Sequence, residues 1–285
     1  MSTPRTTEPL KTTITPARAG RISPAVRPGI YHAWAVLFFA ANLGTLVLLG
    51  LHHFLWALIV FFLPAPWYAI QIMKPSARGL GPAVTHFTTS QRAVWLTIDD
   101  GPDPQSTPAI LDLLEAQGAH ATFFLVGEKV LRHPELVAQI LQHGHSVGNH
   151  THTHPCSWFW CGSAKQTAAE IDACANALRQ AGAGSSHWFR PPVGLKNHSL
   201  HPQLAARGLD LVLWSARGFD TTCHNPVRSL ARITGRLQPG AILLVHENAD
   251  NPAMRTELLS ALLNHLAKEN YACVLPPGEA LIRES

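Results

Sequence analysis

The sequence is poor in charged residues, which make up only 14% of its 285 positions, whereas 46% are hydrophobic. Acidic residues are scarce near the N-terminus, where residues 1–30 contain five Lys or Arg residues and a single acidic one, Glu8. The net charge at pH 7 is only +4. This modest, localised positive charge favours orientation at a membrane rather than nucleic-acid binding. We therefore expect no nucleic-acid partner.

The chain also lacks a cysteine framework. Its five cysteines are an odd number, and their spacing does not match a zinc knuckle or a disulfide scaffold. Two of them, Cys156 and Cys161, are near in sequence, but spacing alone leaves their pairing open. No repeat or low-complexity tract interrupts the chain from about residue 92 onward, so this region is expected to be one domain.

Long hydrophobic runs fill residues 31–73, between a Thr-, Pro- and Arg-rich segment over residues 1–30 and a Gly-, Pro- and Ser-containing segment over residues 74–91. We expect the first segment to be a disordered basic tail and the last to be a linker. About 20 apolar residues cross a bilayer, so residues 31–73 are long enough for a transmembrane hairpin turning at residues 50–53. A single span followed by an interfacial segment is the alternative. A cleaved signal peptide or a core hairpin fits less well, because the apolar region begins late and is too long for a signal sequence.

The distribution of positive charge predicts the orientation. A basic tail is expected on the cytoplasmic side, and a hairpin returns the following domain to that side, where Lys74, Arg78 and Arg92 also obey the positive-inside tendency. A single span would place the domain outside. We expect an integral protein of a bacterial-type inner membrane, and we prefer the hairpin with a cytoplasmic domain.

From residue 92 to the end, strand-like apolar runs alternate with helical stretches, which is typical of βα units and a parallel sheet. Helices are expected over residues 107–117 and 168–180, where apolar residues recur on one side. The sequence therefore predicts an α/β fold, a distorted (β/α) barrel of about seven parallel strands within residues 92–285. The strands are expected at residues 93–98, 121–126, 146–149, 187–190, 209–214, 241–246 and 271–275.

Two adjacent carboxylates, Asp99 and Asp100, follow the first of these runs and precede Gly101-Pro102. The C-terminal ends of parallel strands carry the active sites of barrels and open α/β sheets. Adjacent carboxylates in a partly buried place repel each other, and a bound cation is the simplest relief. A turn that merely caps the next helix is the alternative.

Histidines gather after the third expected strand, in the sequence HTHTH. If this piece forms one helical turn, His150 and His154 lie on the same face at the i, i+4 spacing, which lets two imidazoles bind one ion. His152 would then point away. One Asp with two His leaves a coordination position open for water, so the Asp pair and the histidines together favour a metal site.

These two segments and three later ones resemble, in order, the motifs of the NodB-like polysaccharide deacetylases, carbohydrate esterase family 4. The matching stretches are TIDDGP, HTHTH, FRPPVG, LWSARGFD and LVH, spread over about residues 92–276. The resemblance implies that Asp99 is the general base. It also implies that Asp100, His150 and His154 bind one divalent metal ion, Zn²⁺ or alternatively Co²⁺, Mn²⁺ or Fe²⁺.

The later motifs carry the remaining roles that the resemblance implies. Arg190 pairs with the base, and the backbone near Pro192 and Val193 helps to hold the oxyanion. Asp220 orients and tunes His246, the general acid. Such a set suits amide hydrolysis, because a base activates water, a cation and backbone donors stabilise the oxyanion, and an acid protonates the leaving amine.

Two departures from the family pattern touch the groove wall and not the metal or the proton-transfer groups. The family often has an aromatic residue where Val193 stands and a Trp where Thr221 stands. An aromatic loop that begins at Trp158 follows the histidines and is expected to stack on a sugar, contact the bilayer or touch a lipid tail. A lid packed over the barrel is the alternative for this loop.

The resemblance and the hydrophobic N-terminal region together imply a membrane-anchored hydrolase that removes an N-acyl group, acetyl or formyl, from an amino sugar. The anchor and the aromatic loop favour a lipid-linked or envelope saccharide as the substrate. The alternatives are a peptidoglycan or chitin-like polysaccharide deacetylase, a catalytically inactive glycan-binding protein on the same scaffold, and a membrane scaffold.

Overall fold

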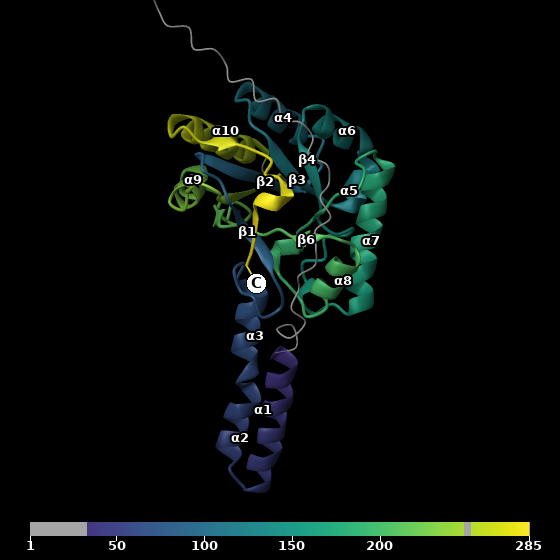
Figure 1. Cartoon of the computed structure of the whole chain (residues 1–285), viewed down its shortest axis with the longest axis vertical. Helices are drawn as coiled ribbons and strands as arrows, with labels where there is room; N and C mark the ends of the chain where they lie inside the picture. Colours follow the sequence, from purple (N-terminus) through teal and green to yellow (C-terminus); the bar gives the residue numbers. More distant parts are fainter. Residues whose placement is uncertain (1–32, 248–251, 285) are drawn as a thin grey trace, which may run out of the picture.

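The computed structural model describes residues 33–247 and 252–284, which form a helical hairpin and an α/β domain at one end of it (Figure 1). The helices are α1 (Ala33–Gly50), α2 (Phe54–Phe62), α3 (Pro64–Met73), α4 (Thr107–Ala116), α5 (Gly127–Arg132), α6 (Pro134–Gln142), α7 (Ala164–Gln180), α8 (Leu200–Ala206), α9 (Pro226–Thr234) and α10 (Pro252–Lys268). The strands are β1 (Ala83–Phe87), β2 (Ala93–Gly101), β3 (Ala121–Leu125), β4 (Ser146–Asn149), β5 (Trp188–Phe189), β6 (Asp210–Leu211), β7 (Ala216–Arg217), β8 (Ile242–His246), β9 (Ala272–Cys273) and β10 (Leu281–Glu284).

Eight strands of the domain form one parallel sheet. Seven of them follow the order β6-β5-β4-β3-β2-β8-β7, and β9 pairs with β2 beside this path. Strands β6 and β7 stand at the two ends of this path. Among the described residues they do not pair with each other, so the barrel is open. The predicted α/β fold with a distorted barrel of about seven parallel strands is confirmed.

Side chains of the central strands alternate between two apolar layers, as the two-residue period of a strand requires. Leu96 and Leu243 belong to the layer that packs against the surrounding helices, with Leu262 of α10 among its members. Trp95 and Leu244 belong to the inner layer. Both faces are therefore buried, which explains why these strands appear in the sequence as continuous apolar runs.

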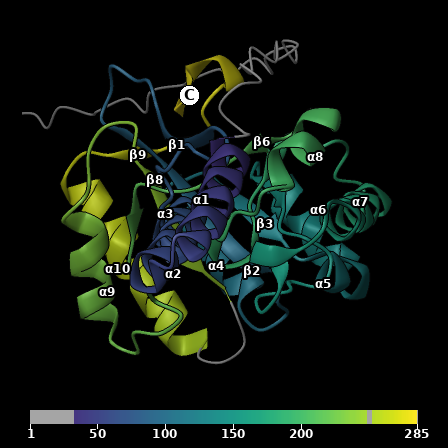
Figure 2. The ribbon, with the colours of Figure 1, turned by 90° about the horizontal axis from the view of Figure 1, so that it is seen from below.

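Seen along the hairpin, α9 and α10 lie on one side of the hairpin and α5 to α8 on the other (Figure 2). Helix α7 begins four residues earlier than predicted. The side chain of Ser163 accepts a hydrogen bond from the backbone of Gln166, whose side chain bonds back to Ser163. This capping box satisfies free N–H groups at the helix start and thereby fixes its first turn.

Strand β1 corrects the expectation of a linker over residues 74–91. It pairs antiparallel with β10, near the other end of the chain. It also links the edge strand β6 to the start of β8: Leu213 N–H donates to Val84 O at 2.8 Å, and Phe87 N–H donates to Gly240 O at 2.9 Å. β1 therefore belongs to the folded domain and ties the open barrel together.

In the hairpin, α1 packs against α2 and α3, and the chain turns at Leu51–His53 as predicted. The part of the hairpin after the turn consists of α2 and α3, and Pro64 is the first residue of α3. At this position the N–H group that proline lacks would have no partner within the helix. The 20-residue stretch Phe54–Met73 is long and apolar enough to cross a membrane, whereas the apolar part of α1 is shorter.

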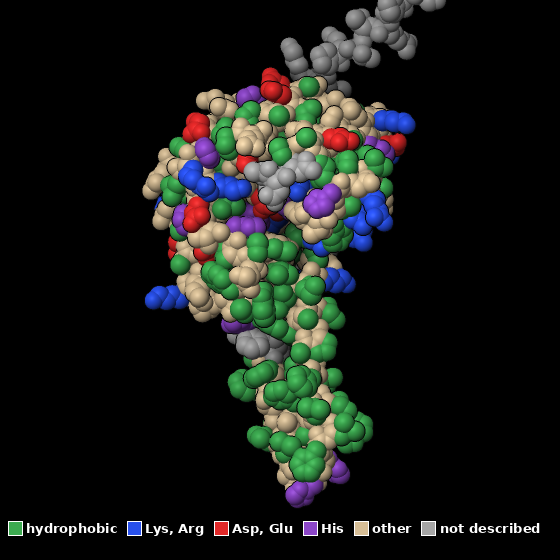
Figure 3. Space-filling model, turned by 180° about the vertical axis from the view of Figure 1, so that it is seen from behind, with side chains coloured by type: hydrophobic (Ala, Val, Ile, Leu, Met, Phe, Trp, Pro, Cys, Tyr) green, Lys and Arg blue, Asp and Glu red, His purple; other side chains and the backbone are tan. Residues whose placement is uncertain are grey.

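Hydrophobic side chains cover most of the hairpin surface (Figure 3). Only 11% of the apolar window within Phe54–Met73 is buried, whereas the core helix of a soluble protein is mostly buried. The hairpin is compatible with a membrane anchor, and by composition a signal sequence passes the same test. The basic segment over residues 1–30 lies outside the described residues.

Candidate metal and acid–base site

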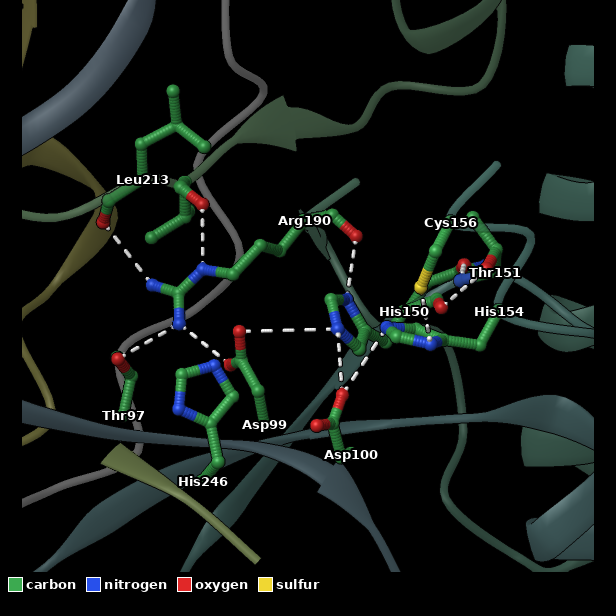
Figure 4. Close-up of polar contacts among 12 residues, drawn as sticks. Thr97, Asp99, Asp100, His150, Thr151, His154, Cys156, Arg190, Leu213 and His246 are labelled. Atoms are coloured by element: carbon green, nitrogen blue, oxygen red, sulfur yellow. Dashed lines mark hydrogen bonds and ion pairs between the residues drawn. The ribbon is translucent and has the colours of Figure 1, made fainter. Parts of the chain in front are cut away.

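The two aspartates of the first motif lie at the end of β2, in the middle of the sheet. Asp99 is 2% exposed and is paired in register with His246 on the neighbouring strand β8. Between Asp99 and Gly101 the register with β3 shifts, and Asp100 has a φ of 75°. Asn and Asp tolerate this left-handed conformation better than most residues. The bulge gives the two adjacent carboxylates different neighbours, as Figure 4 shows.

The histidine motif is not a helical turn, which corrects the sequence prediction. Thr151 and His154 have positive φ values of 66° and 54°, so the chain follows an irregular loop. Glu170 of α7 holds this loop, because its Oε2 accepts hydrogen bonds from the N–H groups of His152 and Thr153 at 2.8 and 2.9 Å. His150 and His154 nevertheless converge on Asp100, although a loop and not a helix positions them.

Asp100, His150 and His154 offer three ligand atoms that all lie within 4.8 Å of one another. Asp100 Oδ1 lies 3.4 Å from His150 Nε2 and 3.2 Å from His154 Nε2 (Figure 4). His150 Nδ1 donates to Arg190 O at 2.8 Å, and His154 Nδ1 lies 3.3 Å from Cys156 Sγ. Both Nδ1 atoms are therefore engaged, which directs both Nε2 atoms toward Asp100.

This donor set fits a metal ion. His154 Nε2 is buried and is directed at Asp100 Oδ1, 3.2 Å away. Burial alone would lower the pKa of His154, but hydrogen bonds with Asp100 and Cys156 raise it to about 10. Burial would likewise raise the pKa of Asp100, yet the two imidazoles hold it well below its ordinary range. One carboxylate with two imidazoles is a ligand set that suits zinc and related divalent ions, so the three residues could hold such an ion.

Arg190, which follows β5, fixes the other aspartate. Its Nη1 lies 2.6 Å from Asp99 Oδ1 and donates to Thr97 Oγ1 at 2.8 Å. Its Nε and Nη2 donate to the carbonyl oxygens of Val212 and Leu213 at 2.9 and 3.1 Å. Arg190 is 0% exposed, so these bonds compensate a charge that would otherwise be costly to bury. The other oxygen, Asp99 Oδ2, lies 3.8 Å from His150 Nε2 and faces the cluster.

His246 and Asp220 form the third part of the site. Asp220 accepts two hydrogen bonds from His246, from Nδ1 at 3.0 Å and from the backbone N–H at 2.9 Å. Arg255 of α10 lies 3.0 Å from the same carboxylate. Burial would lower the pKa of His246, but the charge of Asp220 raises it above its ordinary value. Burial would raise the pKa of Asp220, but His246 and Arg255 lower it.

The three residues expected near the substrate lie on loops. Pro192 is buried, and Val193 is 51% exposed with a φ of 58°, an unusual conformation for a β-branched residue. Pro192 has no N–H, so within this pair only Val193 N–H can act as an oxyanion donor. Trp158 is half-buried and packs against Gly162 and Phe159. The structure thus brings together the metal and acid–base residues, whereas Trp158 has no contact with them among its described interactions.

Several residues of the site carried no recognisable sequence signal. Glu170 and Arg255 contact site residues that are distant from them in sequence. Cys156 contacts His154 within an irregular loop. Glu247 follows His246 directly and is fully buried. Its Oε2 accepts a hydrogen bond from Thr107 at 2.9 Å, its Oε1 has no partner among the described residues, and burial raises its pKa to about 8.

Comparisons with known proteins agree with this arrangement. The family model described as polysaccharide deacetylase matches residues 86–212, a range that contains the aspartates, the histidines and Arg190. The chain is 32% identical over 188 residues to a peptidoglycan-N-acetylglucosamine deacetylase of Bacillus cereus, covering 65% of this chain and 86% of the relative. It is 35% identical over 157 residues to a chitooligosaccharide deacetylase of Bradyrhizobium, covering 55% and 71%.

A solved structure of a family 4 carbohydrate esterase from Streptomyces lividans, in complex with acetate, superposes with a TM-score of 0.60 at 29% identity. The match covers 66% of this chain and 95% of the esterase. The open parallel barrel of this chain, with aspartates and histidines at its strand ends, is thus the fold of the carbohydrate esterases of family 4. The chain belongs to the polysaccharide deacetylase family, whose deacetylases are metal-dependent.

Proposed function

We propose that this protein is a metal-dependent hydrolase that removes an N-acyl group, acetyl or formyl, from an amino sugar. The observation that carries the proposal is the convergence of Asp100, His150 and His154 beside the Asp99–Arg190 pair and the Asp220–His246 pair. Each pair has a distinct chemical task.

The triad of Asp100, His150 and His154 would hold the metal ion, Zn²⁺ or one of Co²⁺, Mn²⁺ and Fe²⁺. When bound, such an ion lowers the pKa of water from 15.7 to about 7 and polarises the carbonyl of the amide. Because Arg190 O and Cys156 Sγ engage the Nδ1 atoms of the two histidines, the Nε2 atoms are pre-oriented as ligands. This support from outside the triad maintains ring orientation and ligand basicity.

Asp99 would act as the general base that takes the proton from the attacking water. Arg190 binds its Oδ1 from one side, so Oδ2 remains directed toward the metal cluster. The guanidinium also compensates the charge of the buried carboxylate through a short, charge-assisted contact.

His246 would act as the general acid that protonates the leaving amine. Its pKa is raised because Asp220 lies against Nδ1, which favours the protonated imidazole that an acid requires. Val193 N–H is the backbone donor available for the oxyanion. A catalytically inactive glycan-binding protein would not need this complete set of base, acid and ligands.

The names of the relatives support an N-acetylated sugar as the substrate, in peptidoglycan or in chitooligosaccharide. The apolar hairpin and the aromatic loop at Trp158 favour a lipid-linked or envelope saccharide, with a peptidoglycan or chitin-like polymer as the second candidate. Exposed Trp160, Val193 and Phe219 add apolar surface within or just after the motif segments, and aromatic faces suit stacking on sugar rings or contact with lipid.

The hairpin would anchor the enzyme in a bacterial-type inner membrane. A helix of 20 residues is about 30 Å long, which matches the hydrocarbon core. The two arms turn at Leu51–His53, so a hairpin that inserts fully returns the domain to the side of the basic tail, the cytoplasmic side. A reporter fused after Ser285 that is active only outside the cytoplasm would contradict this topology.

The test of the proposed reaction compares Asp99→Asn with the wild type in the full chain purified in detergent. We expect the variant to keep its bound metal and to lose at least about 100-fold in acetate release from an N-acetylglucosamine oligomer, because general base catalysis contributes about 10² to 10⁴. Asp112→Asn, an exposed carboxylate on α4, is the matched control and should behave as wild type. Undiminished acetate release by Asp99→Asn would remove Asp99 as the base.

A further inference from the structure

A cavity of about 950 Å³ lies between the end of the hairpin and the edge strand β7. We call it the basic pocket. Four positively charged side chains line it: Lys74, Arg217, Arg232 and Arg236. Its lining contains no Asp or Glu. A cavity with charge of one sign concentrates ions of the opposite sign, so this one attracts anions.

The arginines of the pocket are not neutralised by carboxylates. Among the described residues, no salt bridge joins Arg217, Arg232 or Arg236 to an acidic side chain. Arg217 is half-buried, and its guanidinium lies 3.9 Å from the centre of the Phe219 ring. Burial lowers the pKa of Arg217, which the charge of Asp220 opposes and that of Arg236 reinforces. The cluster therefore carries mutual repulsion that an oxyanion would relieve, and guanidinium groups match phosphate oxygens in bidentate geometry.

The pocket is located where the chain leaves the hairpin. Lys74 directly follows the last residue of α3, and its carbonyl accepts a hydrogen bond from Lys196 Nζ at 3.0 Å, which ties this junction to the domain. If Phe54–Met73 crosses the hydrocarbon core, Lys74 and its neighbours lie at the level of lipid head groups. Figure 3 shows Lys and Arg side chains on the domain surface just beside this junction.

The pocket also borders the catalytic centre. Trp214 lines the pocket, and the guanidinium of Arg190 lies 5.7 Å from the centre of its ring. Trp214 also packs closely against Gly194, which follows the proposed oxyanion donor. Phe219 lines the pocket and immediately precedes Asp220, the partner of the proposed acid. Trp214 and Phe219 thus connect the pocket to Arg190, the partner of the proposed base, and to Asp220, the partner of the proposed acid.

We propose that the basic pocket binds the phosphate or diphosphate group that links a saccharide substrate to its lipid. This inference rests on the proposed deacylase function and deepens it. The lipid would lie along the hairpin, the phosphate in the pocket, and the N-acyl sugar beyond Trp214 and Phe219 at the metal cluster. The pocket would select lipid-linked saccharides over free polymers, because only the former carry the phosphate.

Two measurements on the full chain in neutral phosphatidylcholine nanodiscs test the proposal. The first is binding of inorganic pyrophosphate by calorimetry, which does not depend on catalysis. The second is the ratio of kcat/KM for an N-acetylglucosamine linked to a lipid by diphosphate to kcat/KM for the methyl glycoside of the same sugar. The variant is Arg232→Gln with Arg236→Gln, and the control is Lys165→Gln with Arg179→Gln, which removes two exposed charges from α7.

We expect the pocket variant to weaken pyrophosphate binding and to lower the kcat/KM ratio by about tenfold or more, since hydrogen bonds to charged groups are the stronger ones. The control should change neither. An unchanged ratio and unchanged pyrophosphate affinity would overturn the proposal. If the variant instead weakens pyrophosphate binding while the kcat/KM ratio holds, the pocket binds an anion other than the phosphate linker of the substrate and the proposal is wrong. Failure of wild type to release acetate from either substrate, with pyrophosphate still bound, would contradict the proposed function and not the anion site.

Discussion

Replacement of Arg190 by Met tests the electrostatic core of the site. Arg190 is 0% exposed and Asp99 is 2% exposed, and their closest atoms are 2.6 Å apart. Met removes the guanidinium and leaves the carboxylate buried without its counter-charge, along with two carbonyl oxygens that Arg190 satisfied. Breaking one partner of a buried pair costs about 3–5 kcal/mol. For a domain of this size, each kcal/mol shifts Tm by about 2–4 °C, so a fall of about 6–20 °C is expected.

The assay is thermal unfolding of the full chain in detergent with EDTA, because a metal ion beside Asp99 would compensate its charge. The double variant Arg190→Met with Asp99→Asn removes both charges and should recover part of the lost Tm. Arg190→Lys keeps a charge but loses the fork of donors and should fall between wild type and Met. A loss of Tm below about 2 °C for Arg190→Met, or no recovery in the double variant, would refute the argument that this ion pair is buried and closely coupled.

Three further variants address the rest of the site. Asp220→Asn removes the anion that raises the pKa of His246; since the acid must be protonated, activity is lost as pH rises through that pKa, and the alkaline limb of kcat should move to lower pH. An unmoved limb in the pH profile would exclude His246 as the acid. Cys156→Ala should weaken metal affinity about 10- to 100-fold by competition with a chelator, because residues behind metal ligands contribute that much, whereas Cys161→Ala should not. Glu247→Gln should become more stable relative to the wild type as the pH rises from 5 to 8. Burial raises the pKa of this carboxyl in the folded protein to about 8, so the carboxyl ionises at lower pH in the unfolded chain, and the wild type loses folding free energy over that window. Urea unfolding measures the difference in unfolding free energy between this variant and the wild type. The same difference at pH 5 and at pH 8 would contradict the raised pKa of Glu247.

The sequence predicted the parts of the fold that depend on short-range patterns. The run before Asp99 is buried from Ala93 onward, and a strand covered on both faces must be apolar throughout. Because strand ends share one edge of a parallel sheet, the motif residues at the ends of β2, β4, β5 and β8 were expected to meet there. The fold class followed from this alternation of strands and helices.

Other features depend on contacts that no local pattern encodes. β1 has a buried strand sequence, but it pairs with β10 from the far end of the chain, so composition alone suggested a linker. The spacing of His150 and His154 indicated a helical turn, whereas positive φ values and the carboxylate of Glu170 from α7 determine the loop. The i, i+4 spacing therefore predicted the right pair of residues for a geometric reason that the structure does not share.

The proposed roles of the remaining site residues also depend on distant partners. Arg255 comes from α10 and reaches Asp220, which follows β7. The sequence between them gives no sign of that contact, because it arises only when α10 packs beside α9 on the sheet. The charge of the basic pocket is similarly dispersed in sequence from Lys74 to Arg236 and collects only in the folded chain.

The most direct test of the account is the metal content of the purified full chain, measured by elemental analysis after exposure to one equivalent of zinc and removal of excess. We expect about one divalent ion per chain in the wild type and in the control His187→Ala with His224→Ala, which removes two exposed histidines. His150→Ala with His154→Ala should bind almost none and should release no acetate. Metal content that is unchanged in this double variant would contradict the central claim that Asp100, His150 and His154 form the metal site.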